Sequence, residues 1–181
     1  DKLIIKGGAE LRGSISIKGS KNSALPIMVS ALLSDNNLKL KNIPKLDDIT
    51  NMSKLLRSYG AIIKSKNDNL DINCKNIVNI DADYDIVRKM RASILILGPL
   101  LSRFGKAKIS LPGGCAIGTR PIDIHLQGLK KLGANFTVEN GYVVGEVNNQ
   151  LIGSNINLPF PSVGATENIM MAAVKAKGKT I

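Results

Sequence analysis

Aromatic residues are scarce in this chain of 181 residues: Phe, Tyr and Trp together make up 3% of it, and tryptophan is absent. Proteins that bind single-stranded nucleic acids by base stacking need exposed aromatic side chains, so this composition disfavours that class. There are only two cysteines and one histidine, too few for a disulfide framework or a structural zinc site. We therefore expect a protein of a reducing compartment that holds no metal.

Long apolar runs are also missing. No window approaches the roughly 20 apolar residues of a membrane span, and residues 1–6 lack the basic and apolar regions of a secretory signal. We expect no association with a membrane and a location in the cytoplasm. Apolar residues still make up 44% of the chain, which suffices for the core of one domain or slightly more.

Acidic residues are outnumbered by basic ones. The chain has 25 Lys and Arg against 14 Asp and Glu, which gives a net charge of +11. Such an excess permits binding to nucleic acids, membrane surfaces or small anions. Because aromatic residues for stacking are few, we favour small anionic ligands and expect no nucleic-acid partner.

Helical and strand-like segments alternate, and similar segments recur about every 70 residues. Three small-residue helices are apolar around much of their circumference and are predicted to be buried, and two amphipathic helices lie between them. The predicted helices span residues 21–33, 47–59, 90–104, 122–132 and 164–177, and the predicted strands span residues 14–18, 37–41, 61–64, 70–73, 108–111, 135–138, 142–146 and 155–158. This order indicates an α/β repeat fold with buried helices inside and sheets outside. The third copy is unfinished at Ile181, so we expect a fragment of a longer protein.

The glycine-rich segment at residues 111–121 places a thiol between glycines and follows it with a cation. Glycines let the backbone around Cys115 approach a bound group, while Arg120 and the start of a helix favour the thiolate. This pattern predicts a reactive cysteine that faces an anionic substrate. The alternative is a small, inert residue packed beside a turn. Cys74 lacks such neighbours, and we interpret it as structural.

Four segments, in chain order, carry a resemblance to a known family: GSKNSALPIMVSALL, KMRASILILGPLLSRFG, SLPGGCAIGTRPIDIHLQGL and PSVGATENIMMAA. They resemble those of the bacterial UDP-N-acetylglucosamine enolpyruvyl transferases, and the resemblance covers essentially the whole chain. It implies an inside-out α/β barrel of βαβαββ units, truncated after about two and a half repeats. It also implies that residues 1–20 carry first strands that belong to, or link with, another domain, and that residues 21–181 form an incomplete domain with the UDP-sugar site and the catalytic loop.

The same resemblance implies an activity. Members of the family transfer the enolpyruvyl group of phosphoenolpyruvate to the 3′-hydroxyl of UDP-N-acetylglucosamine and release phosphate, the first committed step of peptidoglycan synthesis, without an organic cofactor or catalytic metal. Cys115 matches the family's general acid, which protonates the methylene carbon of phosphoenolpyruvate and forms an adduct with it. The family's sugar-deprotonating aspartate and further arginines belong to the C-terminal half, so these 181 residues alone are expected to be inactive.

Binding residues follow from the resemblance as well. For phosphoenolpyruvate they are Lys21, Asn22 and Arg120; for UDP-N-acetylglucosamine they are Arg91, Arg120, Pro121, Ile122, Asp123, Ile124, His125, Ser162, Val163 and Gly164. Phe160 stands where some members carry a lysine, which removes a cation beside the nucleotide. The residues alone also allow a solvated Lys21 next to a capping Asn22, and a His125 that only packs.

Two other functions fit parts of the sequence. An enolpyruvyl transferase that acts on shikimate 3-phosphate shares the architecture but lacks the loop cysteine. A non-catalytic module that binds RNA or other anions would account for the positive charge, and its RNA binding would depend steeply on salt.

Overall fold

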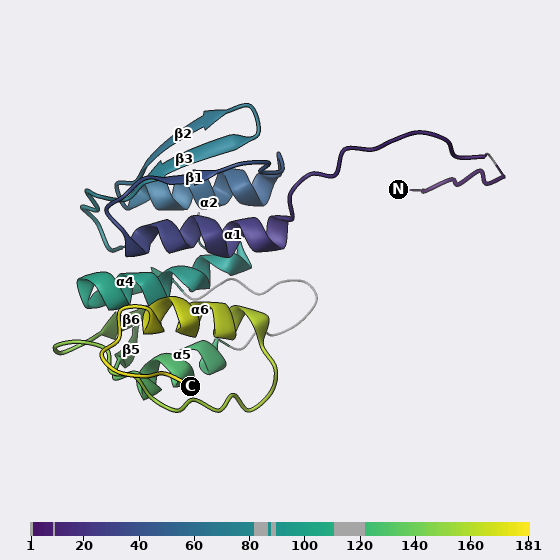
Figure 1. Ribbon diagram of the computed structural model, residues 1–181. Helices are drawn as coiled ribbons and strands as arrows, with labels where there is room; N and C mark the ends of the chain where they lie inside the picture. The colour runs from purple at the N-terminus through teal and green to yellow at the C-terminus, as the bar shows by residue number, and fades with distance from the viewer. Residues whose placement is uncertain (1, 9, 82–86, 88–89, 111–121) are drawn as a thin grey trace.

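The computed structural model describes residues 2–8, 10–81, 87, 90–110 and 122–181, in which central helices lie between two antiparallel sheets (Figure 1). The elements in chain order are α1 (Lys21–Ser30), η1 (Ala31–Leu33), β1 (Leu38–Leu40), α2 (Asp47–Ser58), β2 (Ile62–Lys66), β3 (Asn69–Asn73), η2 (Arg91–Ile96), α4 (Leu97–Phe104), β4 (Lys106–Ser110), α5 (Asp123–Lys131), β5 (Asn135–Glu139), β6 (Tyr142–Glu146) and α6 (Val163–Ala173). The order of helices and hairpins predicted from the sequence is confirmed.

Two units repeat the same topology. In each, a buried helical segment leads to a strand, an amphipathic helix and a β-hairpin. The last strand of each hairpin lies in the middle of its sheet, in the orders β1-β3-β2 and β4-β6-β5. Both hairpin turns contain an asparagine with positive φ, Asn67 at 55° and Asn140 at 50°, a conformation that asparagine tolerates better than most residues. The chain therefore folds as a structural repeat.

The first strand of each repeat is reduced to a few backbone contacts. Gly19 N–H donates to the Asn42 carbonyl at 3.1 Å, Asp81 forms a parallel bridge with Lys108, and Ile152 forms one with Lys177. The predicted strands 14–18 and 155–158 are therefore wrong as regular strands. A strand needs a partner along its length, and each of these segments meets one only near a single end.

The core lies between the helices that the sequence predicts to be buried, α1, α4 and α6, which stack beside one another in Figure 1. Met28 and Leu100 are fully buried among them. α4 and α6 approach closely at Gly98, where a Cβ atom would lie 2.3 Å from the carbonyl oxygen of Asn168. The helix predicted over 164–177 ends at Ala173, because the Lys177 N–H pairs with the Leu151 carbonyl instead.

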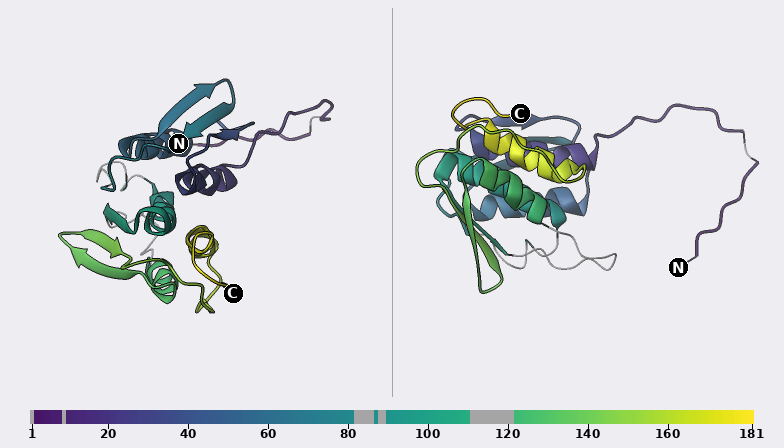
Figure 2. Two further views of the ribbon diagram at one scale, coloured as in Figure 1. Left: turned by 60° about the vertical axis from the view of Figure 1, so that its left-hand side comes forward. Right: turned by 90° about the horizontal axis from the view of Figure 1, so that it is seen from below.

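The amphipathic helices α2 and α5 lie beside the sheets, α2 against β2 and α5 against β5 (Figure 2, left view), while α4 of the core also contacts β4 and β6 directly. α2 buries Met52, Leu55 and Leu56, while α5 buries Ile124 and Leu129. None of the helices in the described residues is both long enough and apolar enough to cross a bilayer.

The N-terminal segment before α1 extends away from the helices (Figure 1). Its leucine and isoleucine side chains, including Leu3, Leu11 and Ile17, are at least 80% exposed. Their assignment to another domain stays a prediction.

Candidate functional site

Several helices begin at the same end of the molecule. The first residues of α1, of the continuous η2–α4 segment, of α5 and of α6 lie at the right-hand end of Figure 1, and the right view of Figure 2 agrees for α1, α5 and α6. The N-terminal N–H groups of a helix lack partners within the helix and carry partial positive charge, so they attract anions. The structure thus brings together the predicted residues Lys21, Asn22, Arg91, Asp123 and Val163, which stand at these helix starts.

The start of α1 presents an accessible cation. Ser20 caps the helix, its Oγ accepting from the Ser23 N–H at 3.4 Å. Lys21 Nζ lies 2.8 Å from Asp48 Oδ2 near the start of α2, and the lysine side chain remains 42% exposed. An ion pair this exposed contributes little free energy, so an anionic ligand can compete for the lysine. Asn22 is exposed beside it.

The start of α6 is capped in the same manner. Ser162 Oγ accepts from the Ala165 N–H at 3.3 Å, and Thr166 Oγ1 donates to the Ser162 carbonyl at 2.8 Å. Val163 is 77% exposed. Gly164 lies against the imidazole of His125: a Cβ atom at this glycine would stand 3.4 Å from His125 Cε1 and 3.7 Å from Nε2. Ser162, Val163, Gly164 and His125 therefore lie together, as a shared ligand site requires.

His125 is 5% exposed, and its lowered pKa leaves the imidazole neutral at physiological pH. Burial, together with the smaller effect of the positive charge of Arg91, lowers the pKa of its imidazole to about 4. Its Nδ1 lies 3.1 Å from Asn168 Nδ2. His125 is thus packed in the protein interior and at the same time lies beside the start of α6. Among its neighbours in the chain, Asp123 is exposed, Ile122 is half-buried and Ile124 is buried in the core.

Cys115, Arg120 and Pro121 lie outside the described residues, and their roles stay predictions.

Cys74 is fully buried, as expected of a structural cysteine, and burial raises the pKa of its thiol to about 11. Phe160 is 52% exposed. No group of three His, Cys, Asp or Glu residues placed to hold a metal ion occurs in the described part of the chain.

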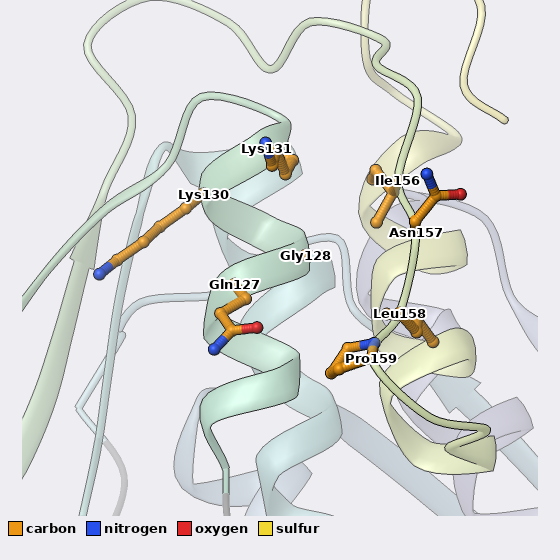
Figure 3. A pocket seen from close by; sticks show the side chains of 8 residues that line it. All are labelled: Gln127, Gly128, Lys130, Lys131, Ile156, Asn157, Leu158 and Pro159. Carbon is orange, nitrogen blue, oxygen red and sulfur yellow. The ribbon is translucent and has the colours of Figure 1, made fainter.

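Two cavities of the described structure lie away from these residues. The first, of about 370 Å³, lies between α5 and residues 156–159 (Figure 3). The second, of about 380 Å³, lies beside α2 and the β2–β3 turn. In Figure 3 the Lys130 side chain points away from residues 156–159. None of the predicted site residues lines either cavity. Two further side chains near these residues, Asp48 in the first turn of α2 and Asn168 in the second turn of α6, were not predicted from the sequence.

Comparisons with known proteins agree on one family. The model of the family described as EPSP synthase (3-phosphoshikimate 1-carboxyvinyltransferase) matches residues 5–181. The chain is similar to the UDP-N-acetylglucosamine 1-carboxyvinyltransferases of Trichlorobacter lovleyi, with 50% identity over 181 residues, and of Dinoroseobacter shibae, with 53% identity over 183 residues. Each alignment covers 100% of this chain and 43% of the relative, so the chain spans less than half the length of these relatives.

Solved structures show the same fold at much lower identity. The enolpyruvyl transferase NikO from Streptomyces tendae superposes with a TM-score of 0.80 and 18% identity, over 96% of this chain and 41% of that one. EPSP synthase from Acinetobacter baumannii superposes with a TM-score of 0.72 and 19% identity, over 93% of this chain and 39% of that one. These likenesses confirm the enolpyruvyl transferase fold predicted from the sequence. With the family model matching residues 5–181, the chain belongs to the EPSP synthase (3-phosphoshikimate 1-carboxyvinyltransferase) family.

Proposed function

We propose that this protein transfers the enolpyruvyl group of phosphoenolpyruvate to the 3′-hydroxyl of UDP-N-acetylglucosamine, in the cytoplasm, and releases phosphate. The observation that carries the proposal is the identity of 50% and 53% with relatives named for this activity, over the whole of this chain. Because the chain spans 43% of those relatives, catalysis also needs a C-terminal half that supplies the remaining groups. The glycine-rich segment with Cys115 favours this substrate over shikimate 3-phosphate.

The helix starts suit the charges of both substrates. Phosphoenolpyruvate carries a phosphate and a carboxylate, and the proposal assigns them to Lys21, Asn22 and Arg120. The diphosphate of the UDP-sugar is assigned to the α6 start at Ser162–Gly164 and to His125, with Arg91 and the residues from Pro121 to Ile124 contributing. Exposed cations and helix N-termini at one end of the molecule support this assignment, because both bind oxyanions.

The proposed chemistry starts at the Cys115 thiol. Its proton moves to the methylene carbon of phosphoenolpyruvate, which leaves the adjacent carbon electrophilic. The 3′-hydroxyl oxygen then adds to that carbon and loses its proton to a base in the C-terminal half. The resulting tetrahedral ketal returns a proton from its methyl group to the Cys115 thiolate as the bond to the phosphate oxygen breaks, so the enol ether and inorganic phosphate are formed and the thiol is restored.

Substrate choice is tested with the complete protein. Phosphate release from phosphoenolpyruvate is measured with UDP-N-acetylglucosamine and, separately, with shikimate 3-phosphate. We expect release only with the UDP-sugar. Release only with shikimate 3-phosphate would show that the protein is instead the enolpyruvyl transferase that acts on shikimate 3-phosphate. Steeply salt-dependent RNA binding without any turnover would favour the non-catalytic module that binds RNA or other anions.

Fosfomycin, which alkylates the family's loop cysteine, tests the role of Cys115. Mass spectrometry of the treated protein is expected to find the adduct on Cys115, and Cys115→Ser is expected to abolish both adduct and turnover. Cys74→Ser is the matched control: Cys74 is fully buried and its thiol has a pKa of about 11, so this variant should keep both. Full activity of Cys115→Ser would contradict the proposed mechanism.

A further inference from the structure

One buried polar residue has no part in the proposed chemistry. Asn168 lies in the second turn of α6, a helix of small and apolar residues, and is fully buried. Its amide contacts three other elements. Oδ1 accepts from the Gly98 N–H of α4 at 2.7 Å, and Nδ2 donates to the Ile94 carbonyl of η2 at 3.1 Å. Nδ2 also lies 3.1 Å from His125 Nδ1 on α5.

The two backbone partners determine how the amide is oriented. A backbone N–H can only donate, so the Asn168 atom that faces Gly98 must be the oxygen. A carbonyl can only accept, so the atom that faces Ile94 must be the nitrogen. The amide nitrogen has a second hydrogen, and this hydrogen is directed to His125 Nδ1.

The amide orientation in turn determines the state of His125. An imidazole nitrogen that accepts a hydrogen bond carries no proton, so the ring proton of the neutral form must reside on Nε2. Protonation of Nδ1 would set two donors against each other. Burial and the charge of Arg91 disfavour the imidazolium as well. Nε2 lies on the Gly164 side of the ring, at the start of α6.

We propose that Asn168 is a positioning residue of the nucleotide site: it holds His125 as the Nε2–H tautomer, so that this N–H donates to a phosphate oxygen of the UDP-sugar at the α6 start. The inference rests on the proposed function for the identity of the ligand. The tautomer itself rests only on the contacts of Asn168. Asn168 acts through His125 and does not contact the ligand.

The tautomer is tested by NMR. His125 is the only histidine in these 181 residues. In the complete protein labelled with ¹⁵N-histidine, its signals are those that His125→Gln removes. We expect one protonated nitrogen, assigned to Nε2, and one unprotonated nitrogen at pH 7. Addition of UDP should shift the Nε2 signal. A proton on Nδ1, or an Nε2 signal unchanged by saturating UDP, would overturn the proposal.

Asn168→Asp tests the positioning role at nearly constant side-chain size. A carboxylate still accepts from the Gly98 N–H but cannot donate to His125 Nδ1, so the ring must reverse its tautomer or gain a proton. We expect the Kd for UDP and the KM for UDP-N-acetylglucosamine to rise at least tenfold, with less than a twofold change in the KM for phosphoenolpyruvate. Met170→Leu, at a 60% exposed position on the same helix, should leave all these constants unchanged.

A double variant separates positioning from a merely structural effect. If Asn168 acts through the imidazole, Asn168→Asp should weaken UDP binding far less in the His125→Gln background than in the native one. Equal weakening in both backgrounds would overturn the proposal. The wild-type NMR result stands even if Asn168→Asp fails to fold. Failure of the proposed function is recognised separately, by absence of turnover in a protein whose His125 carries its proton on Nε2.

Discussion

At the scale of single residues, buried His125 makes folding sensitive to acid. The pKa of the imidazole is about 4 in the folded protein and about 6.5 in the unfolded chain. As the pH falls below 6.5, the unfolded chain gains a proton that the folded protein does not, so stability is lost until the pH reaches about 4. Linkage gives a loss of about 2 kcal/mol between pH 7 and pH 5.

This prediction is tested by comparing how much stability the wild type and the His125→Gln variant each lose between pH 7 and pH 5. Chemical denaturation at pH 7 and pH 5 should show a larger loss of stability for the wild type than for His125→Gln. The carboxylates titrate in both proteins, so their contribution cancels. Equal losses would contradict a neutral, buried histidine.

The residues that the sequence identifies at this site, among them Lys21, Arg91 and His125, stand in recognisable motifs at helix starts. Asn168 stands in one of these motifs too, but nothing in an apolar helix indicates what a single polar side chain contacts. Its partners Ile94, Gly98 and His125 lie 74, 70 and 43 residues away in the chain. Its role follows only from contacts made on folding.

At the scale of elements, two glycines let α6 pack closely against its neighbours. A Cβ atom on Gly98 of α4 would lie 2.3 Å from the Asn168 carbonyl oxygen, whereas a Cβ atom on Gly128 of α5 would lie 2.0 Å from Ile169 Cδ1. The first obstacle is backbone, and the second is the far end of a side chain that can rotate. Gly98→Ala should therefore destabilise the protein by about 3 kcal/mol and Gly128→Ala by about 1 kcal/mol.

Thermal denaturation of the two variants checks this order. Ile169→Val removes the methyl group that Gly128→Ala would meet, so the double variant Gly128→Ala/Ile169→Val should regain part of the lost stability. The same change should not rescue Gly98→Ala. Similar losses for the two glycine variants would show that α4 and α5 are equally free to move relative to α6.

The helices and hairpins could be predicted because their signals are local: apolar periodicity, terminal glycines and turn asparagines. The segments 14–18 and 155–158 alternate like strands, yet whether they form strands depends on a partner elsewhere. In residues 14–18 the Ile17 carbonyl accepts from the Asn42 side chain and Lys18 pairs with Asp68, both near the C-terminal end of the segment. Pairing of this kind is a property of the fold and is invisible in the segment itself.

At the scale of the whole molecule, the repeat explains why the candidate site lies at one end. In the second and third repeats the segment before the buried helix forms a parallel bridge with a segment after it, and in the first repeat Gly19 pairs with Asn42 in the corresponding place. Every buried helix therefore runs in the same direction and begins at the same end (Figure 1). Lys21, Arg91 and Val163 reach this end from three successive repeats. The site is thus a consequence of repetition rather than of any single motif.

A half-buried cation, Arg103, links the two complete repeats. Arg103, in the last turn of α4, has a side chain that is only 12% exposed. Its Nη1 donates to the carbonyls of Leu32 at 2.8 Å and of Cys74 at 2.9 Å, both in the first repeat, and its Nη2 pairs with Asp35. Hydrogen bonds from charged groups are among the stronger ones, and their loss leaves carbonyls without donors.

Arg103→Ala should therefore lower the free energy of unfolding by about 2–4 kcal/mol, and Arg103→Lys should restore only part of it, because an ammonium group cannot reproduce the planar fork. Lys106→Ala is the matched control: its ion pair with Glu146 is exposed, so its removal should cost less than about 1 kcal/mol.

Hydrogen exchange should quicken in α1 and β3 of Arg103→Ala before it does so in β5 and β6. This order is expected because the first repeat loses its attachment while the second keeps its own hairpin. Equal stability of Arg103→Ala and Lys106→Ala would mean that helix packing alone holds the repeats together.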